Sequence, residues 1–369
     1  MSERKRVAAL DAFRGLTIAA MILVNNPGSW SYVYAPLRHA EWHGWTPTDL
    51  IFPFFLFIMG TSMAFSLLPA LETAAARGPL LRRIARRSAL LVALGLFMSA
   101  FPRFDPTSMR FPGVLQRIGL VYLAAGTLMV VLAPRALGIV AALLLLGYWA
   151  LMALVPVPGF GPGNLAPDAN LAAWLDRSLF GTHLWRDTWD PEGLLSTLPA
   201  IATTLAGLYA GAVLRSPRTP AERTATLFVA GWTAMVAGLM WNPVFPINKN
   251  LWTSSYVLFT GGVAAQALAA CYWVIDVRGR NRWCVPAIVF GRNAIAVFVL
   301  SGLVARSLIL IHVTAPDGTS TSLYGWIYRV LFVPWAGPMN GSLAFALATV
   351  GAWFAVTAYL YRRRVFMTV

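Results

Sequence analysis

Residues 25–49 read NNPGSWSYVYAPLRHAEWHGWTPTD, and this stretch decides the fold because it joins two strongly apolar runs. Prolines at positions 27, 36 and 47 and glycines at 28 and 44 exclude a continuous helix across it. It nevertheless holds two of the chain's four histidines, a glutamate, an aspartate and three tryptophans. The flanking runs, 12–24 and 50–68, are apolar enough for lipid, although the first reaches span length only with its polar ends. We therefore predict a polar loop between two membrane spans, and we place the chemistry there.

The composition of the whole chain is that of a polytopic membrane protein. Hydrophobic residues make up 58% of the 369 positions and charged residues 12%, which lies outside the range of soluble domains. We predict an all-α polytopic membrane protein with about ten transmembrane helices and a single domain over residues 1–369. The expected spans are 12–29, 49–71, 88–104, 114–132, 137–155, 194–213, 226–241, 254–275, 285–304 and 343–361. Residues 1–10 are too short for a cleavable signal, so we expect the first span to stay in the mature protein.

The net charge of +15 is explained by membrane topology. With the N-terminus placed inside, 18 of the 29 basic residues fall in short inner segments, where positive charge reports orientation. We therefore predict that both termini are cytoplasmic, and the charge requires no nucleic-acid partner. The two cysteines, Cys271 and Cys284, offer no disulfide framework.

Polar groups near the inner edges of the expected spans form a first set, consisting of Asp11, Arg14, Arg292, Asn293 and the arginine-rich loops. Asp11 and Arg14 are three residues apart, which brings them onto one helix face. Two interpretations are open. The two residues form an ion pair that anchors the first span, or Arg14 faces an anion that arrives from the cytosol.

A second set gathers near the outer edges, and its members come from three separate parts of the sequence. These are Asn25, Asn26, His39, Glu41, His43, Asp49, Arg117, Asn248, Lys249 and Asn250. Asp49 is in position to cap the helix that follows it. Arg117 lies inside the start of the fourth expected span, where it either belongs to a site or reaches back to the interface. We expect the long outer loop 156–193 to fold as a cap, since it is rich in aromatic residues.

His39 and His43 are four residues apart, a spacing seen in zinc pairs. The surrounding prolines and Gly44 argue against a long helix there, and no third ligand is evident, so we predict no metal site. A general base at His39 has better support, because imidazole titrates near neutral pH and often accepts protons in catalysis. The alternative is a histidine that only structures the loop. Further along, Gly207 and Gly211 have the spacing that lets helices approach closely.

Five motifs together resemble the heparan-α-glucosaminide N-acetyltransferase family in its bacterial form. They occur in the family's order and approximate spacing across nearly the whole chain. The motifs are LDAFRGLTIAAMILVNN at 10–26, HAEWHGWTPTDLIFPFFLFIMG at 39–60, GVLQRIG at 113–119, FPINKNLW at 245–252 and GRNAI at 291–295.

The resemblance implies an enzyme, a transmembrane acyltransferase in a bacterial inner membrane. Acetyl-CoA would enter from the cytosol, and its acetyl group would pass to the amine of a glucosamine-type sugar on the periplasmic side. The family's active-site histidine corresponds to His39 and its partner asparagine to Asn25. The resemblance also suggests a homodimer.

Further roles are assigned by chemistry. Asp49 would orient His39 or the sugar, and Trp42 and Trp45 would stack on the sugar unless they belong to an interfacial aromatic belt. The expected CoA-binding residues are Arg14, Arg117, Arg292 and Asn293, and Asn248 and Lys249 are expected to bind the acceptor. The main alternative is a secondary transporter of amino sugars without acetyl transfer, and the buried polar groups argue against a non-catalytic scaffold.

Overall fold

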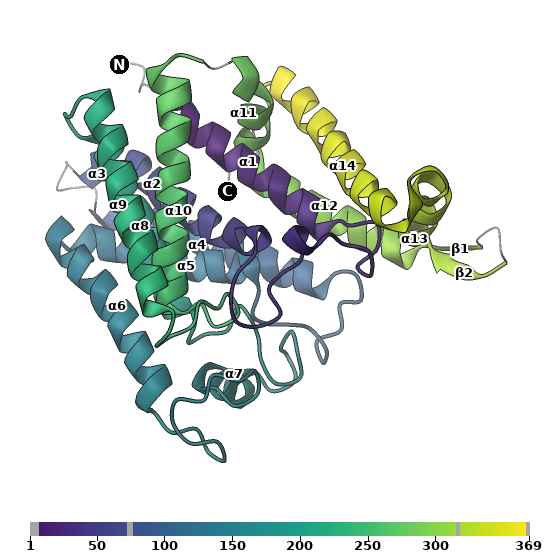
Figure 1. Cartoon of the computed structure of the whole chain (residues 1–369), viewed down its shortest axis with the longest axis horizontal. Coiled ribbons are helices and arrows are strands. Elements are labelled where there is room, and N and C mark those ends of the chain that lie inside the picture. Colours follow the sequence, from purple (N-terminus) through teal and green to yellow (C-terminus); the bar gives the residue numbers. More distant parts are fainter. Residues whose placement is uncertain (1–6, 72–76, 281, 315–317, 367–369) are drawn as a thin grey trace. The chain divides into compact units, whose positions relative to one another are not determined.

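The computed structural model of the chain describes residues 7–71, 77–280, 282–314 and 318–366, and almost all of its ordered elements are helices (Figure 1). Within these residues, eight helices are long and apolar enough to cross a membrane, or nine if one bent pair counts as a single span. The prediction of an all-α membrane protein is confirmed. The count of ten spans and the side of each terminus stay predictions.

The expected third span, 88–104, corresponds to a longer and more basic helix, α4 (Arg77–Ala100). The helix begins within the basic segment and ends at Ala100, shortly before Pro102. Arginines at positions 82, 83, 86 and 87 lie in its first half, and this charge keeps α4 outside the eight candidate spans.

The chain divides into two compact units, and the division runs through the histidine-bearing loop. The first unit comprises residues 1–39, 46–51 and 274–369, and the second comprises residues 40–45 and 52–273. His39 and Asp49 therefore belong to the first unit, whereas His43, Trp42 and Trp45 belong to the second.

In its described residues, the first unit is built on five α-helices with a short hairpin between the third and fourth. The helices are α1 (Ala8–Asn25), α11 (Val285–Arg292), α12 (Ala294–Leu310), α13 (Leu323–Ile327) and α14 (Val333–Arg362). The hairpin pairs β1 (His312–Thr314) with β2 (Ser320–Ser322) in antiparallel register. The expected ninth span, 285–304, is broken, because Asn293 leaves helical geometry and α11 and α12 meet at 77°. The expected tenth span begins earlier, at Val333, and is interrupted at Gly337.

Helices α1 and α11 pack at very close range through glycine (Figure 1). A Cβ atom at Gly15 would lie 1.7 Å from the carbonyl oxygen of Ala287, and one at Gly291 would lie 2.1 Å from that of Asp11. Small residues allow this approach in membranes, where packing and not water exclusion joins helices. The contact sets the N-terminal half of α1 beside the end of α11 that carries Arg292.

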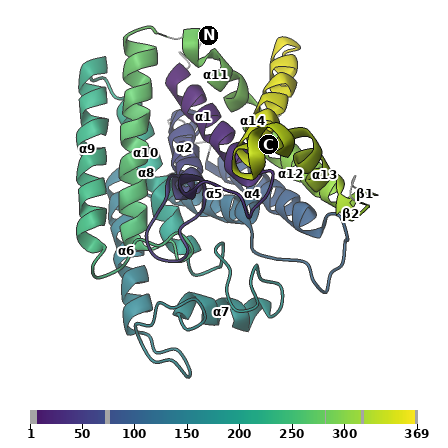
Figure 2. The ribbon, with the colours of Figure 1, turned by 45° about the vertical axis from the view of Figure 1, so that its right-hand side comes forward.

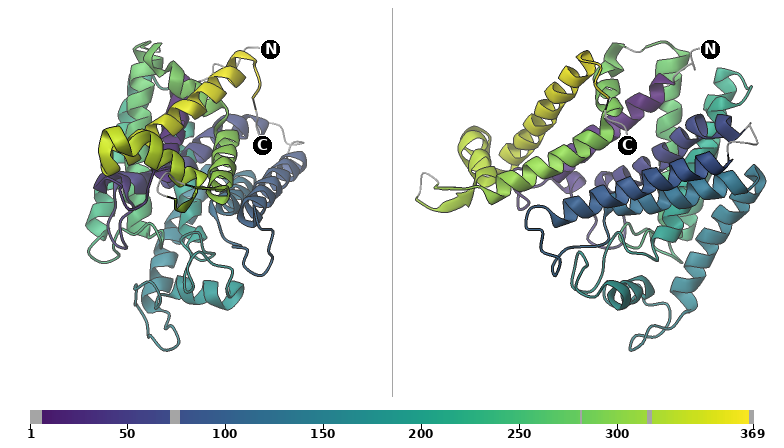
Figure 3. Two further views of the ribbon diagram at one scale, coloured as in Figure 1. Left: turned by 90° about the vertical axis from the view of Figure 1, so that its right-hand side faces the viewer. Right: turned by 180° about the vertical axis from the view of Figure 1, so that it is seen from behind.

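The second unit contains the remaining helices, which include two closely packed neighbouring pairs. Its helices are α2 (Ile51–Ser66), α3 (Leu68–Leu71), α4, α5 (Val114–Val131), α6 (Pro134–Leu154), α7 (Leu171–Phe180), α8 (Thr197–Arg215), α9 (Pro220–Trp241) and α10 (Ser254–Tyr272). Helix α9 runs along α10 (Figure 2), and α4 runs along α5 (Figure 3).

The expected close approach at Gly207 and Gly211 is confirmed, and the partner helix is α2. A Cβ atom at Gly207 would lie 2.0 Å from the Phe57 carbonyl oxygen, and one at Gly211 would lie 2.6 Å from the Ala64 side chain. Gly60 of α2 makes the reciprocal contact with Thr204. Three glycines thus hold the helix that follows the histidine loop against α8.

Residues 156–193 carry α7 and pack on a hydrophobic cluster that includes Tyr148, Phe245 and Leu251. Asn170 caps α7 by accepting the N–H of Ala173 at 2.8 Å. Trp42 joins the same cluster, with its ring edge-to-face against Trp189 and its Nε1–H donating to the Leu165 carbonyl at 2.9 Å. This contact fastens the middle of the histidine loop to the 156–193 segment.

Candidate functional site

The strongest chemical feature of the first unit is a histidine–carboxylate pair. Nδ1 of His39 lies 2.6 Å from Oδ1 of Asp49, whose side chain is 1% exposed, whereas the His39 side chain is 47% exposed. A buried carboxylate at this distance accepts a strong, charge-assisted hydrogen bond. We infer that Nδ1 carries the proton, which leaves Nε2 as the basic nitrogen of an accessible ring.

The two carboxylate oxygens of Asp49 have different tasks. Oδ1 faces His39, and Oδ2 accepts the backbone N–H of Thr46 at 3.0 Å, in a capping box that starts the 3₁₀-helix Pro47–Leu50. The capping role and the His39 contact therefore coexist. The cap ties the orientation of His39 to the start of α2.

The residues just before His39 are fixed by local hydrogen bonds. The hydroxyl of Thr46 donates to the Arg38 carbonyl at 2.6 Å, and Nε of Arg38 donates to the Val33 carbonyl at 2.7 Å. These bonds fix the backbone beside His39 and beside Asp49. They do so without a regular helix, which the prolines exclude.

Helix α1 ends at Asn25, as Pro27 predicts. Asn26 is buried, and its amide donates to the Ile22 carbonyl at 2.8 Å. Asn25 is exposed, and its side chain makes no hydrogen bond within the described part of the chain. Its amide is therefore available to a ligand in the same unit as His39.

The polar set that we expect near the inner membrane edge lies around the α1–α11 contact of the first unit. Arg14 pairs with Asp11 at 2.9 Å, as their spacing predicts, and lies 3.5 Å from the Gly291 carbonyl. The Arg292 guanidinium lies over the rings of Tyr361 and Phe366, at 5.2 and 5.1 Å. Its buried Nε has no partner among the described residues.

Asn293 completes this polar set. It is fully buried at the break between α11 and α12, and its amide donates to the Val365 carbonyl at 3.2 Å. The structure thus brings Arg14, Arg292 and Asn293 together in one unit, as the sequence led us to expect.

In the second unit, the acceptor-side candidates lie at the turn before α10. Asn248 is fully buried, and its Nδ2 lies 3.3 Å from Nδ1 of His43. Lys249 follows it in the same turn. Trp45 is 43% exposed, with its ring centroid 4.7 Å from that of Phe259. Trp42 is committed to packing, so Trp45 has the more open ring of these two tryptophans.

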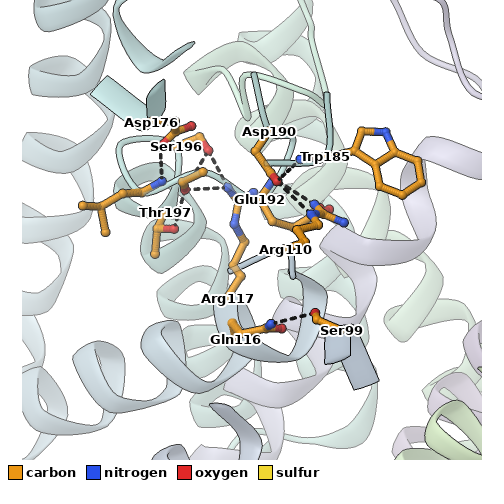
Figure 4. A network of polar contacts seen from close by, with 12 residues as sticks. Ser99, Arg110, Gln116, Arg117, Asp176, Trp185, Asp190, Glu192, Ser196 and Thr197 are labelled. Carbon is orange, nitrogen blue, oxygen red and sulfur yellow. Dashed lines mark hydrogen bonds and ion pairs between the residues drawn. The ribbon is translucent and has the colours of Figure 1, made fainter. Parts of the chain in front are cut away.

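Arg117 is enclosed by protein (Figure 4). Its Nη2 donates to the Gly193 carbonyl at 2.9 Å and to the Ser196 hydroxyl, and its guanidinium lies 5.2 Å from the Trp252 ring centroid. Nε and Nη1 have no partner among the described residues. The geometry ties α5 to the start of α8, and CoA binding by Arg117 stays a prediction.

A cluster of carboxylates surrounds this arginine (Figure 4). Asp190 and Glu192 both pair with Arg110, whose Nε donates to Asp190 at 2.8 Å. Asp176 of α7 accepts the Leu194 N–H at 2.9 Å, and burial raises the pKa of Asp176 to about 7. The sequence shows no pattern that would join these acidic residues to Arg110 and Arg117.

Within the described residues, no group of three histidine, cysteine, aspartate or glutamate side chains is arranged to hold a metal ion. His183 is a packing residue, since its ring stacks on Phe111 at 4.1 Å and Nδ1 lies 2.7 Å from the Met109 carbonyl.

Comparison with known proteins identifies the family of this chain. Residues 6–238 match the family described as heparan-alpha-glucosaminide N-acetyltransferase, catalytic. The chain is 32% identical over 357 residues to the human heparan-alpha-glucosaminide N-acetyltransferase, an alignment that covers 80% of this chain and 52% of the human protein. The mouse protein of the same name is 32% identical over 360 residues, covering 81% of this chain and 53% of the relative. The chain thus spans about half the length of these relatives. It belongs to the heparan-alpha-glucosaminide N-acetyltransferase family.

Proposed function

We propose that this protein is a transmembrane N-acetyltransferase of a bacterial inner membrane. It takes acetyl-CoA from the cytosol and transfers the acetyl group to the amine of a glucosamine-type sugar on the periplasmic side. Family membership supports the reaction class. The observation that carries the proposal is the His39–Asp49 pair, in which a buried carboxylate orients an accessible imidazole.

The chemistry assigned to His39 is general base catalysis. The amine nitrogen of the sugar attacks the thioester carbonyl, the new C–N bond forms, and Nε2 of His39 takes the proton that the nitrogen loses. The C–S bond then breaks, and His39 returns this proton to the departing CoA thiolate. Asp49 stabilises the imidazolium that exists between the two transfers, as carboxylates do beside catalytic histidines.

The remaining roles follow from charge and exposure. Asn25 donates a hydrogen bond to the thioester oxygen as negative charge develops there, and one such donor is worth about 2.7–4 kcal/mol. Arg14, Arg292 and Asn293 bind CoA, with Arg117 as a further candidate, and Lys249 and Trp45 contact the acceptor. Trp42 and Asn248 contribute to acceptor binding by fixing the conformation of the histidine loop. We also propose a homodimer.

Purified protein supplied with labelled acetyl-CoA and glucosamine tests the proposal. We expect labelled N-acetylglucosamine, and we expect His39→Ala to lower turnover by roughly 10²–10⁴-fold, the usual contribution of a positioned base. His312→Ala is the matched control, because His312 is an exposed hairpin residue whose ring nitrogen contacts the Leu310 carbonyl.

Two results would overturn the proposal. One is glucosamine that crosses liposomes unmodified with no acetylated product, which would identify a transporter. The other is full acetyl transfer by His39→Ala, which would remove the base from the mechanism.

A further inference from the structure

His43 is the second histidine of the loop and has so far received no role. It is exposed, and it neighbours two residues of the second unit that are firmly held. Trp42 donates to the Leu165 carbonyl, and the N–H of Gly44 donates to the Ile247 carbonyl at 2.7 Å. The backbone on both sides of His43 is therefore fixed relative to the turn before α10.

The partner of His43 is equally fixed. The N–H of Asn248 donates to the Thr253 hydroxyl at 3.0 Å, and its backbone carbonyl accepts the Thr253 N–H at 3.2 Å. Its side-chain oxygen accepts the Leu251 N–H at 2.9 Å. The carbonyl end of the amide is thereby identified, and Nδ2 must be the atom that faces His43.

This orientation determines where the imidazole carries its proton. An amide Nδ2 has hydrogens to donate and no lone pair to offer, so Nδ1 of His43 must accept. A neutral ring whose Nδ1 accepts has its hydrogen on Nε2. In a charged ring Nδ1 would also carry a hydrogen, which would face the hydrogens of the Asn248 amide and repel them. Partial burial of the ring also lowers the pKa of His43, which favours the neutral form.

His39 and His43 therefore have opposite tautomers. The carboxylate beside His39 accepts from Nδ1 and makes Nε2 basic, whereas the amide beside His43 donates to Nδ1 and makes Nε2 a hydrogen-bond donor. Nε2 of His43 has no partner among the described residues, and Trp45 adds an open aromatic ring two positions along the chain. A donor beside an aromatic ring suits a ligand with hydroxyl oxygens and an apolar face.

We propose that His43 binds the amino-sugar acceptor by donating its Nε2–H to a hydroxyl oxygen of the sugar, and that Asn248 positions it by fixing the tautomer. The proposal rests on acetyl transfer to an amino sugar as the function. It assigns specificity to His43 and proton transfer to His39, so the two histidines are not interchangeable.

Nitrogen-15 NMR of histidine-labelled protein tests the tautomer without any turnover, since only four histidines contribute signals. We expect His43 to show a protonated Nε2 and an unprotonated Nδ1, and glucosamine added without acetyl-CoA to shift the Nε2 signal. A protonated Nδ1 in the wild type would overturn the proposal. So would an unchanged Nε2 signal at a glucosamine concentration that saturates acetyl transfer.

Kinetics of matched variants supply the second readout. His43→Leu removes the donor, and we expect KM for glucosamine to rise about tenfold, with kcat and KM for acetyl-CoA little changed. His43→Gln restores an N–H near the Nε2 position and should recover most of the affinity. Asn248→Asp keeps the size of the side chain but turns the donor into an acceptor, so KM should rise although His43 is intact.

Equal KM values in wild type and His43→Leu would contradict the proposal while leaving the enzyme an acetyltransferase. Absence of acetyl transfer by the wild type would instead count against the proposed function. The NMR assignment distinguishes these two failures, because it reads the tautomer and glucosamine binding directly.

Discussion

A single residue, Asp49, connects the fold of the histidine loop to its chemistry. One oxygen accepts from His39 and the other from Thr46, so the same side chain belongs to a helix cap and orients the proposed base. The contrast with Asn248, whose amide donates to a histidine, shows how one change of carboxylate to amide can reverse the use of an imidazole.

Asp49→Asn tests this relation directly. Asp49 is the N3 residue of the capping box, and the side-chain oxygen of asparagine can still accept the Thr46 N–H there, so its NH₂ should face His39. The proton of His39 would then move to Nε2, which could no longer accept one. We expect kcat to fall by roughly 10²–10⁴-fold with little change in melting temperature. An unchanged kcat would show that Asp49 serves the fold alone.

At the scale of elements, the α2–α8 contact fixes the helix that leads away from the histidine loop. Gly207→Ala would place a methyl group 2.0 Å from the Phe57 carbonyl oxygen, which forces the helices apart. We expect a loss of about 1–3 kcal/mol in stability, the usual result of overpacking.

The matched control for that variant is Gly147→Ala in α6. A Cβ atom there meets nothing within 4 Å, and alanine favours a helix over glycine by about 1 kcal/mol. In detergent, the melting temperature should therefore fall below that of the wild type for Gly207→Ala and rise above it for Gly147→Ala. Equal behaviour would mean that the close contact does not limit stability.

The α7 element makes the 156–193 segment sensitive to pH. Burial raises the pKa of Asp176 to about 7 from an ordinary value of 3.8, and the neighbouring Asp190 adds to the shift. A carboxyl group that binds its proton more tightly when folded stabilises the fold at acidic pH, and this stability is lost as the pH rises through about 4 to 7.

Asp176→Asn should remove this dependence, because asparagine stays neutral and can still accept the Leu194 N–H. We expect the melting temperature of the wild type to decrease relative to that of the variant between pH 4 and pH 8. Parallel curves for the two proteins over this range would contradict the assignment of the proton to Asp176.

At the scale of the whole molecule, orientation in the membrane decides whether the proposed reaction is reachable. We expect the histidine loop to be periplasmic and the α8–α9 connection to be cytoplasmic. In a chain with Cys271 and Cys284 replaced by alanine, Glu41→Cys should react with an impermeant maleimide in spheroplasts. Arg218→Cys should react only after permeabilisation, and labelling of both from one side would reject the topology.

Much of this molecule follows from local sequence rules. Pro27 ends α1 at Asn25, and the spacing of Asp11 and Arg14 gives their ion pair, because each depends on one or two helical turns. The apolar runs likewise predict an all-α membrane protein. The start of helix α4 was less predictable. Its basic first half has low hydropathy, so a hydropathy pattern places the start of the span at residue 88, although the helix begins at Arg77.

Contacts between distant residues were not predictable in the same way. His43 and Asn248 are 205 positions apart, and no periodicity joins them. Arg117 likewise meets Gly193 and Ser196 through the packing of α5 on α8. The break at Asn293 depends on a backbone conformation that composition does not report. These features arise from tertiary packing, which fixes hydrogen-bond partners after the helices have formed.

The shared duty of Asp49 has a practical consequence for laboratory evolution. A library screened for expression or heat resistance would discard most replacements at this position before their activity was assayed. Survivors would be mainly asparagine and other capping side chains, and the position would look purely architectural. Only an assay of product formation, applied to those survivors, can test whether the same carboxylate also orients His39 as the proposed base.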